Sequence, residues 1–291
     1  MYINNINYLT EYSNNFSNTN NNDFSEQLVN KLQSSSTTSL LQDPYTKNFD
    51  LIRDFFEINY TSSLDFDIST YYRYGDSNGV IIDDTIFSED NLLYYNSLMK
   101  AEIDDLETFS IYLNLKNSTL WWEDNISNYE YGFVKSINGT TGEVKDSNRY
   151  LTDNLLPIFL LIENIEIDDL ESISIGEESV IDSIKEMFYL INSSEYWDDV
   201  NYGFYNSNSS STGDHVKYTE SNFYSILANL LLHRTFYDLR SDDTLRDRAL
   251  QLANLTMNKI ETKMWDNSQH AFYYDANILW NSVGATSTYY H

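Results

Sequence analysis

Acidic side chains next to tryptophan are the residues of this sequence best suited to chemistry. They occur as Trp122-Glu123-Asp124, Trp197-Asp198-Asp199 and Trp265-Asp266. Glycoside hydrolysis needs a protonated carboxylic acid and an ionised carboxylate across the scissile bond, and a neighbouring aromatic ring would stack on a sugar. In such a site we expect the sugar to be bound by Trp122, Trp197, Tyr202, Trp265 and Tyr273.

The same acids also have a structural interpretation. An Asp that follows Trp in successive copies of a repeat caps a helix or ties a turn by accepting backbone N–H bonds. Catalytic acids should instead break the repeat, and Glu123 and Asp199 have no counterpart beside Trp265. We therefore take them as candidate catalytic residues. His215, beside Asp214, is a third candidate as a general base, with a solvated loop histidine as the alternative.

The sequence predicts no cofactor. Two segments, Asp198–Asn201 and Asp76–Gly79, carry oxygen ligands suited to Ca²⁺, but neither completes the twelve-residue calcium loop. The chain has no cysteine and no closely spaced histidine pair, which argues against zinc. It also lacks the glycine-rich motifs that cradle phosphates.

A repeat would position these residues. A helical pattern precedes each aromatic turn, at Phe49–Ile58, Asp105–Leu115, Ser179–Asn192 and Thr244–Met264. Between the turns lie further apolar helices with Asn91, Asn154 and Asn222 near their starts, one of them over Ser221–Tyr237. These Asn residues are 63 and 68 positions apart, and Trp122, Trp197 and Trp265 are 75 and 68 apart. Two landmarks with a similar period indicate stacked helical hairpins.

The predicted fold class is all-α: an (α/α) toroid or an open array of about four to five helical hairpins with short β-like aromatic turns. Pro157 lies near the start of its predicted helix, where a missing N–H matters least. Residues 1–23 are rich in Asn, Ser and Tyr and are interpreted as a loosely ordered arm. Residues 24–291 are interpreted as a single repeat domain.

The charge balance excludes several partners. The chain has 17 basic and 45 acidic residues, a formal net charge of −28, which disfavours nucleic acid and anionic membrane surfaces. No stretch is apolar enough to span a membrane and no signal peptide is visible. We therefore expect a soluble protein, with the cytoplasm favoured, that binds a glycan or small molecule.

The run from Trp197-Asp198 through Gly203-Phe204-Tyr205 to Asn222 resembles the (α/α) toroid proteins, which include the N-acylglucosamine 2-epimerase family, the cellobiose 2-epimerases and the six-hairpin glycosidases. The resemblance is best over residues 180–275. It implies a glycoside hydrolase or sugar epimerase that works in an acidic aromatic cleft. The alternative is a non-catalytic repeat scaffold that a partner subunit completes.

The sequence departs from this family at two points. The epimerases use paired histidines as acid and base, whereas none of His215, His233, His270 and His291 matches that pattern. A full toroid has six or seven hairpins, so self-association or a partner chain would have to complete a ring of four or five. These departures leave catalysis itself as the main hypothesis to test.

Overall fold

The computed structural model describes residues 72, 81–99, 104–125, 130–208, 216–240, 242–268 and 270–281. Those from Thr85 onward belong to one compact unit, to which the following description refers. The predicted arm over 1–23 and the helical pattern over Phe49–Ile58 lie outside the described residues. Within the described part of the chain, no helix is long and apolar enough to cross a membrane.

Six α-helices make up most of this unit, so the mainly helical class is confirmed for the described residues. The helices are α4 (Ser88–Met99), α5 (Asp105–Lys116), α6 (Leu151–Asn164), α7 (Val180–Ile191), α8 (Thr219–Leu239) and α9 (Asp243–Lys259), with a π-helical turn, η4 (Ile260–Met264), ending the last. The four helices predicted within the described residues agree with these bounds to within two residues at each end, when η4 is counted as the end of α9.

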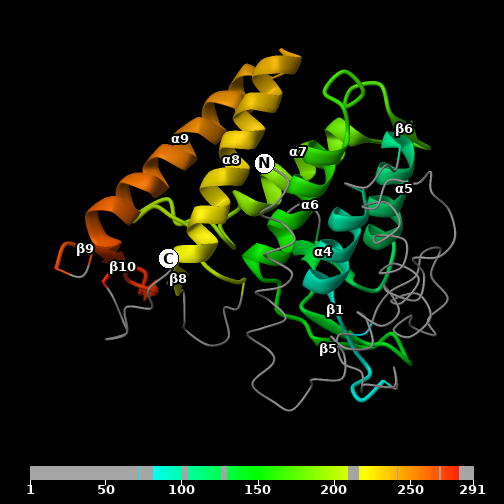
Figure 1. Cartoon of the computed structure of the whole chain (residues 1–291), viewed down its shortest axis with the longest axis horizontal. Coiled ribbons are helices and arrows are strands. Elements are labelled where there is room, and N and C mark those ends of the chain that lie inside the picture. The colour runs from blue at the N-terminus through cyan, green and yellow to red at the C-terminus, as the bar shows by residue number, and fades with distance from the viewer. Residues whose placement is uncertain are drawn as a thin grey trace, which may run out of the picture. The chain divides into compact units, whose positions relative to one another are not determined.

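The helices alternate between two kinds. We call α4, α6 and α8 the first helices, and α5, α7 and α9 the second helices. Central α6 packs against α4 and α8 on its flanks and also contacts α5 and α7, while α9 lies along α8. Figure 1 shows the first helices beginning at the end of the unit that carries β1 and β8, whereas β6 lies at the opposite end.

The second helices begin at side-chain caps. Asp104, Ser179 and Asp242 each accept a hydrogen bond from a backbone N–H in the first turn of their helix, which satisfies a donor that the helix itself leaves unpaired. The first helices α6 and α8 have no side-chain cap at Tyr150 and Tyr218. Their first N–H groups bond elsewhere, at junctions described below.

Pro157 lies inside α6, because the helix begins at Leu151. The sequence placed it nearer the helix start. Proline has no N–H to donate to the carbonyl four residues earlier, here that of Asp153.

Each predicted aromatic turn is a short strand pair. β2 (Trp121–Asn125) pairs with β3 (Glu130–Phe133), Trp197 forms a single bridge to Phe204, and β9 (Trp265–Asp266) pairs with β10 (Ala271–Phe272). In each pair a Trp ring meets a Phe ring at a steep angle, with centroids 4.8–5.0 Å apart. The repeat therefore aligns on Trp121, and not on Trp122, which lies opposite Gly132.

The conserved spacing of the Asn residues has a structural cause within this chain. The side-chain amide of Asn154 accepts from the N–H of Phe133 and donates to its carbonyl, and Asn222 makes the same two bonds to Phe204. The first helices α6 and α8 are thereby each fastened to an aromatic turn. Gly132 has a φ of 130°, and a Cβ there would lie 2.6 Å from Asn154 Oδ1, so only glycine fits beside this clasp.

The remaining strands connect the units. β1 (Thr85–Phe87), β4 (Ser136–Asn138) and β5 (Val144–Asp146) form an antiparallel sheet, and β8 (Lys217–Tyr218) pairs with β11 (Asp275–Ala276). A hairpin of β6 (Ser174–Ile175) and β7 (Glu178–Ser179) precedes α7. The core between the helices is built from fully buried aliphatic and aromatic side chains, among them Phe109, Tyr112, Leu155, Ile158, Ile184 and Phe236.

Candidate functional site

The same backbone hydrogen bond recurs where each first helix begins. Ser88 N–H donates to the Lys135 carbonyl at 3.2 Å, Leu151 N–H to the Asn206 carbonyl at 2.8 Å, and Thr219 N–H to the Tyr274 carbonyl at 2.9 Å. Each acceptor lies two residues after the Phe of an aromatic turn. These three hydrogen bonds align the units residue by residue. Side chains at equivalent positions can therefore be compared directly.

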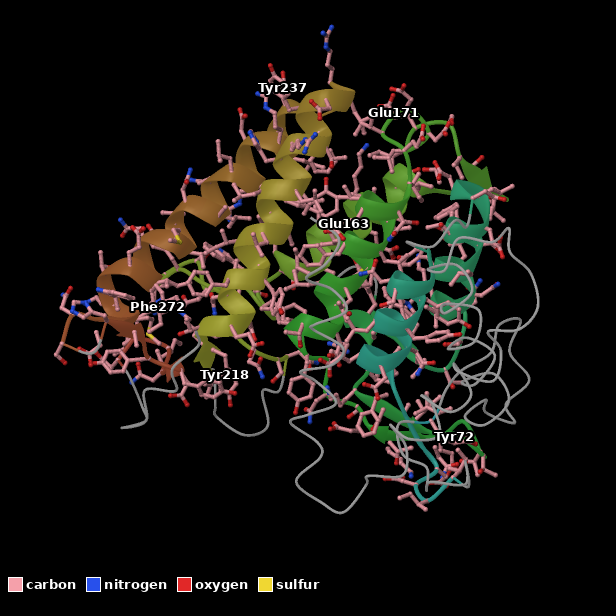
Figure 2. The ribbon with its side chains drawn as sticks, in the orientation of Figure 1. Tyr72, Glu163, Glu171, Tyr218, Tyr237 and Phe272 are labelled. Carbon is pink, nitrogen blue, oxygen red and sulfur yellow. The ribbon has the colours of Figure 1, made fainter. Side chains whose placement is uncertain are left out.

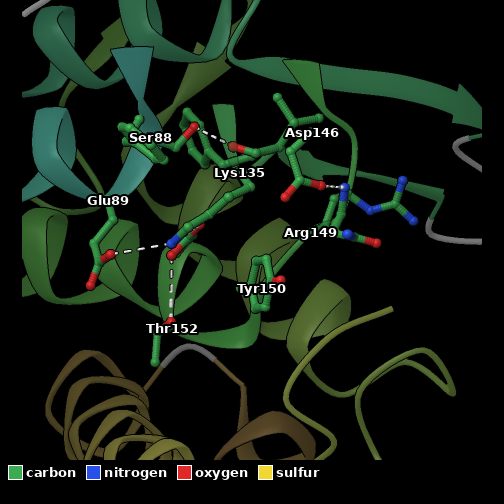
Figure 3. A network of polar contacts seen from close by, with 12 residues as sticks. Ser88, Glu89, Lys135, Asp146, Arg149, Tyr150 and Thr152 are labelled. Atoms are coloured by element: carbon green, nitrogen blue, oxygen red, sulfur yellow. Dashed lines mark hydrogen bonds and ion pairs between the residues drawn. The ribbon is translucent and has the colours of Figure 1, made fainter. Parts of the chain in front are cut away.

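The first junction is charged. Lys135 Nζ lies 3.2 Å from Glu89 Oε2 in the first turn of α4 and 3.6 Å from Asp153 Oδ2 in the first turn of α6. The same ammonium is 5.0 Å from the ring centre of Tyr150. Figure 3 shows Lys135 between Glu89 and the start of α6, with the Tyr150 ring beside it. We call Glu89, Lys135 and Asp153 the charged junction.

Asp153 is the most perturbed group of the charged junction. Its side chain is fully buried, and Oδ2 has no hydrogen-bond partner among the described residues. Burial raises the pKa of this carboxyl to about 7, against the opposing effect of Lys135, because a charge is poorly solvated away from water. Asp153 therefore exchanges a proton near neutral pH, which is typical of groups in functional sites.

The second junction occupies the same positions with neutral side chains. Thr152, Asn206 and Ser221 stand where the first junction has Glu89, Lys135 and Asp153, and Ser221 Oγ donates to Asn206 Oδ1 at 2.9 Å. The backbone hydrogen bond between Leu151 and Asn206 is present here as well, and small polar side chains occupy the positions of the charged ones. The fold therefore does not require charge here. A buried carboxyl that the architecture does not need is a candidate for chemistry.

The third junction is intermediate. Glu220 occupies the position of Glu89, but Tyr274 replaces the lysine. The rings of Tyr218 and Tyr274 lie 5.1 Å apart across this junction. Glu220 is exposed, so it serves as a matched control for Glu89 at the same position of a first helix.

A second buried ion pair lies beside the aromatic turn before α8. Lys217 Nζ bonds Asp198 Oδ2 at 2.8 Å and the carbonyls of Tyr202 and Ile278 at 2.6 and 3.1 Å. Burial lowers the pKa of Lys217 to about 8, although Asp198 opposes this. The ammonium has three acceptors and lies 4.9 Å from the Trp280 ring centre, so this pair fastens the last described segment to the turn.

Asp198 is thus a structural residue. Its Oδ1 accepts from the N–H groups of Val200 and Asn201. Burial raises its pKa, but the bonds from Asn201 and Lys217 outweigh this and hold the pKa below its ordinary value. Because Lys217 already neutralises the carboxylate, the calcium ligands suggested for Asp198–Asn201 are engaged otherwise. Within the described ranges, no group of three or more acidic or histidine side chains is placed to hold a metal.

The structure describes two of the three sequence-predicted catalytic residues. Glu123 is exposed on β2, opposite Tyr131, and Asp199 is exposed in the turn after Asp198. They belong to different aromatic turns. His215 and the segment Asp76–Gly79 lie outside the described residues. The assignment of Glu123, Asp199 and His215 to catalysis stays a prediction.

The predicted sugar-binding aromatics divide into two groups. Trp197 is buried, packed between Phe204 and Tyr202. The others are partly exposed and already have intramolecular contacts: Arg149 lies 4.7 Å from the Trp122 ring centre, Lys259 lies 5.4 Å from that of Tyr202, Trp265 packs on Phe272, and the Tyr273 hydroxyl donates to Asp266.

Comparison with known proteins identifies the architecture. No protein-family model and no curated protein sequence matches the chain. Among solved structures, it is similar to a sugar epimerase from a ruminal bacterium, with a TM-score of 0.55 at 16% identity over 82% of this chain and 59% of that one. It is also similar to the cellobiose 2-epimerase of Bacillus thermoamylovorans, with a TM-score of 0.53 at 14% identity over 83% of this chain and 62% of that one.

The fold resembles that of toroid-type sugar epimerases. The resemblance drawn from the residues around Trp197 and Asn222 is therefore confirmed at the level of fold. The chain spans about three fifths of the length of these two structures. Closure of a ring is not part of this finding.

Sequence reasoning missed the charged junction. Glu89 and Asp153 were visible only as the acids that precede or lie beside the helix-starting Asn91 and Asn154. Lys135 lies two residues past the Phe of an aromatic turn and 46 positions after Glu89, so nothing in the local sequence indicates their contact. Alignment of the units on Trp121 would have shown that Lys135 is a cation at a position where the other two units have the neutral Asn206 and Tyr274.

Proposed function

We propose that this chain is a carbohydrate-active protein of the sugar epimerase or isomerase kind, with the charged junction as its reactive centre. The observation that carries the proposal is Asp153, a buried carboxyl with a pKa near 7 that the equivalent Ser221 shows the fold does not need. The toroid-like fold supports the sugar as substrate class, because two similar structures are sugar epimerases.

The three side chains suit proton transfer next to a sugar carbonyl. Glu89 and Lys135 are partly exposed, at 30% and 21% of the side chain, so they are the groups that would contact a ligand. The carboxylate of Glu89 would accept a proton from carbon, and the ammonium of Lys135 would stabilise the negative oxygen that results. Asp153, which is buried next to Lys135, would hold a proton, and its protonation state would set the net charge beside the Lys135 ammonium.

Glycoside hydrolysis is the competing reaction. A glycosidase needs one carboxyl with a raised pKa as acid and one ionised carboxylate as base. Asp153 and Glu89 have these properties, but hydrolysis would require the buried Asp153 to reach the ligand. A different alternative, a non-catalytic binding scaffold, is favoured by exposed apolar side chains on α8, including Leu227 and Leu230. The products formed from sugars distinguish these three cases.

A junction swap tests the proposal. The variant E89T/K135N/D153S gives the first junction the side chains of the second, so we expect it to fold. Aldoses, ketoses and disaccharides are incubated with the parent and the variant, and the products are followed by NMR. We expect the swap to lower turnover by about 100-fold or more, the range that general acid–base groups contribute, with an unchanged circular dichroism spectrum.

Matched variants locate the site. E220Q alters the equivalent acid of the third junction and should leave turnover within about twofold of the parent, whereas E89Q should abolish most of it. E123Q and D199N test the acids predicted from sequence. Full turnover in the junction swap would contradict the proposal, and loss in E123Q or D199N would move the site to the aromatic turns.

A further inference from the structure

An apolar stripe runs along the exposed side of α8. Tyr224, Leu227 and Leu230 recur at three-residue steps and are all exposed, Leu227 at 54%. Residues at such spacing lie on one side of a helix. Tyr237 continues the row near the C-terminal end, and the labels of Tyr218 and Tyr237 mark the two ends of α8 in Figure 2. A contiguous apolar row of this length is uncommon on a free surface.

The equivalent stripe of α6 is more covered. Leu156, Phe159 and Ile162 occupy the positions of Tyr224, Leu227 and Leu230 when the helices are aligned on their Asn residues, and all three are partly buried. Central α6 has a first helix on each flank, whereas α8 has α6 on one flank and α9 beside it. The α8 stripe is thus a packing surface that lacks a neighbouring helix among the described residues.

The stripe is self-complementary. Its charged residues, Glu220 and Arg234, lie seven residues before and seven after Leu227, on the same side of the helix. An antiparallel copy related by a twofold axis at Leu227 would therefore place Glu220 opposite the partner's Arg234. Arg234 is 79% exposed, and its ion pair among the described residues is with Asp238 of its own helix, at 3.5 Å, an exposed contact of little energetic weight.

The same twofold arrangement places the apolar residues of one copy opposite apolar residues of the other. Tyr224 and Leu230 lie three residues on either side of Leu227, so each would meet the other across the axis. The antiparallel helices would also align their dipoles favourably. Because the chain carries a net charge of −28, association of two copies needs local opposite charges, and the two Glu220–Arg234 contacts would supply them.

We propose that the α8 stripe, defined as Glu220, Tyr224, Leu227, Leu230 and Arg234, is a twofold interface between two copies of this chain. Such an interface is isologous: each copy contributes the same patch. Its apolar centre and charged rim follow the usual organisation of a protein interface.

Sedimentation velocity of the full chain over a range of concentrations tests this proposal. The parent should sediment as a dimer, and L227E should raise the dissociation constant by about 100-fold or more, because it places two carboxylates on the axis. L106E changes a similarly exposed leucine of α5 and should leave the dimer unchanged. Circular dichroism checks that each variant is folded.

Charge reversal makes the test specific for the twofold arrangement. E220R and R234E each place like charges opposite one another and should weaken the dimer by about tenfold, whereas E220R/R234E restores opposite charges and should recover it. If the parent protein is monomeric at all concentrations, the proposal is overturned, because the stripe then does not bind a second copy of the chain. A dimer that withstands L227E would also overturn it.

Discussion

Asp153 and Asp198 show how two buried aspartates of one repeat acquire opposite properties. Asp198 accepts bonds from Lys217 and from the backbone of its own turn, so its charge is solvated by the protein and its pKa falls. Asp153 is also buried, but the cation nearest to Oδ2 among the described residues is Lys135 at 3.6 Å, so the effect of burial prevails and raises its pKa. Burial opposes the ionisation of both carboxyls, and only at Asp198 do hydrogen bonds to the charged form outweigh it.

The raised pKa of Asp153 predicts a specific dependence of stability on pH. The folded state holds the proton up to about pH 7, whereas the unfolded chain loses it near the ordinary value of 3.8. The free energy of unfolding should therefore fall as pH rises from about 4 to about 7 and then level off, with a contribution on the order of 2–4 kcal/mol.

The variant D153N isolates this contribution, because asparagine has a similar shape and no titrating proton. Urea unfolding at several pH values should show that the stability difference between parent and D153N changes between pH 4 and pH 7. A difference that is constant over this range would contradict the assigned pKa.

Single residues also mark the limit of prediction from sequence. Asn154 and Asn222 were recognised as landmarks from their spacing alone, because both make the same clasp to an aromatic turn. Lys135 and Glu89 were missed, because they meet only through a backbone register between segments far apart in the chain. Trp121 and Trp122 are adjacent, and composition cannot tell which faces the Phe of its turn.

At the scale of the element, the sequence predicted where the helices lie but not what makes each first helix begin where it does. Apolar periodicity placed α5, α7, α8 and α9 correctly. The start of a first helix, however, depends on a carbonyl supplied by the next unit, as for Leu151 and Asn206. No local capping residue indicates it, so the helix over Leu151–Asn164 begins three residues before Asn154, near which the sequence placed its start.

The Asn clasp gives a prediction about α8. In N222L, the N–H and the carbonyl of Phe204 both lose a buried partner, so the free energy of unfolding should fall by about 2–5 kcal/mol. N229L is the control: Asn229 is also buried in α8, but its amide donates only to the Ser225 carbonyl of the same helix, and its Oδ1 has no partner among the described residues. Chemical denaturation should find N229L changed by less than about 1 kcal/mol.

For the molecule as a whole, acidity opposes folding. A net charge of −28 produces repulsion that the compact state concentrates, while salt screens it over about 10 Å at 0.1 M. The described ion pairs are few by comparison, and several are exposed. The acidic composition was evident from the sequence, whereas the contacts of Lys135, Arg149 and Lys217 with carboxylates and aromatic rings were not.

The prediction at this scale concerns salt. The melting temperature should rise by several degrees between 10 mM and 500 mM sodium chloride, because screened repulsion stabilises the folded chain. Calorimetry at several salt concentrations measures this. A melting temperature that falls with salt would show that attractive ion pairs outweigh the net repulsion.

The recurring backbone bond at the start of each first helix has a consequence for how new chemistry can arise in this architecture. The main chain alone sets the geometry of a junction, so the three side chains around it can change together without altering the helices. The neutral junction of Thr152, Asn206 and Ser221 is thus a position at which charged side chains could be introduced. Exchanging these for Glu, Lys and Asp would install a second charged centre one helix away, in a molecule whose core has not been touched.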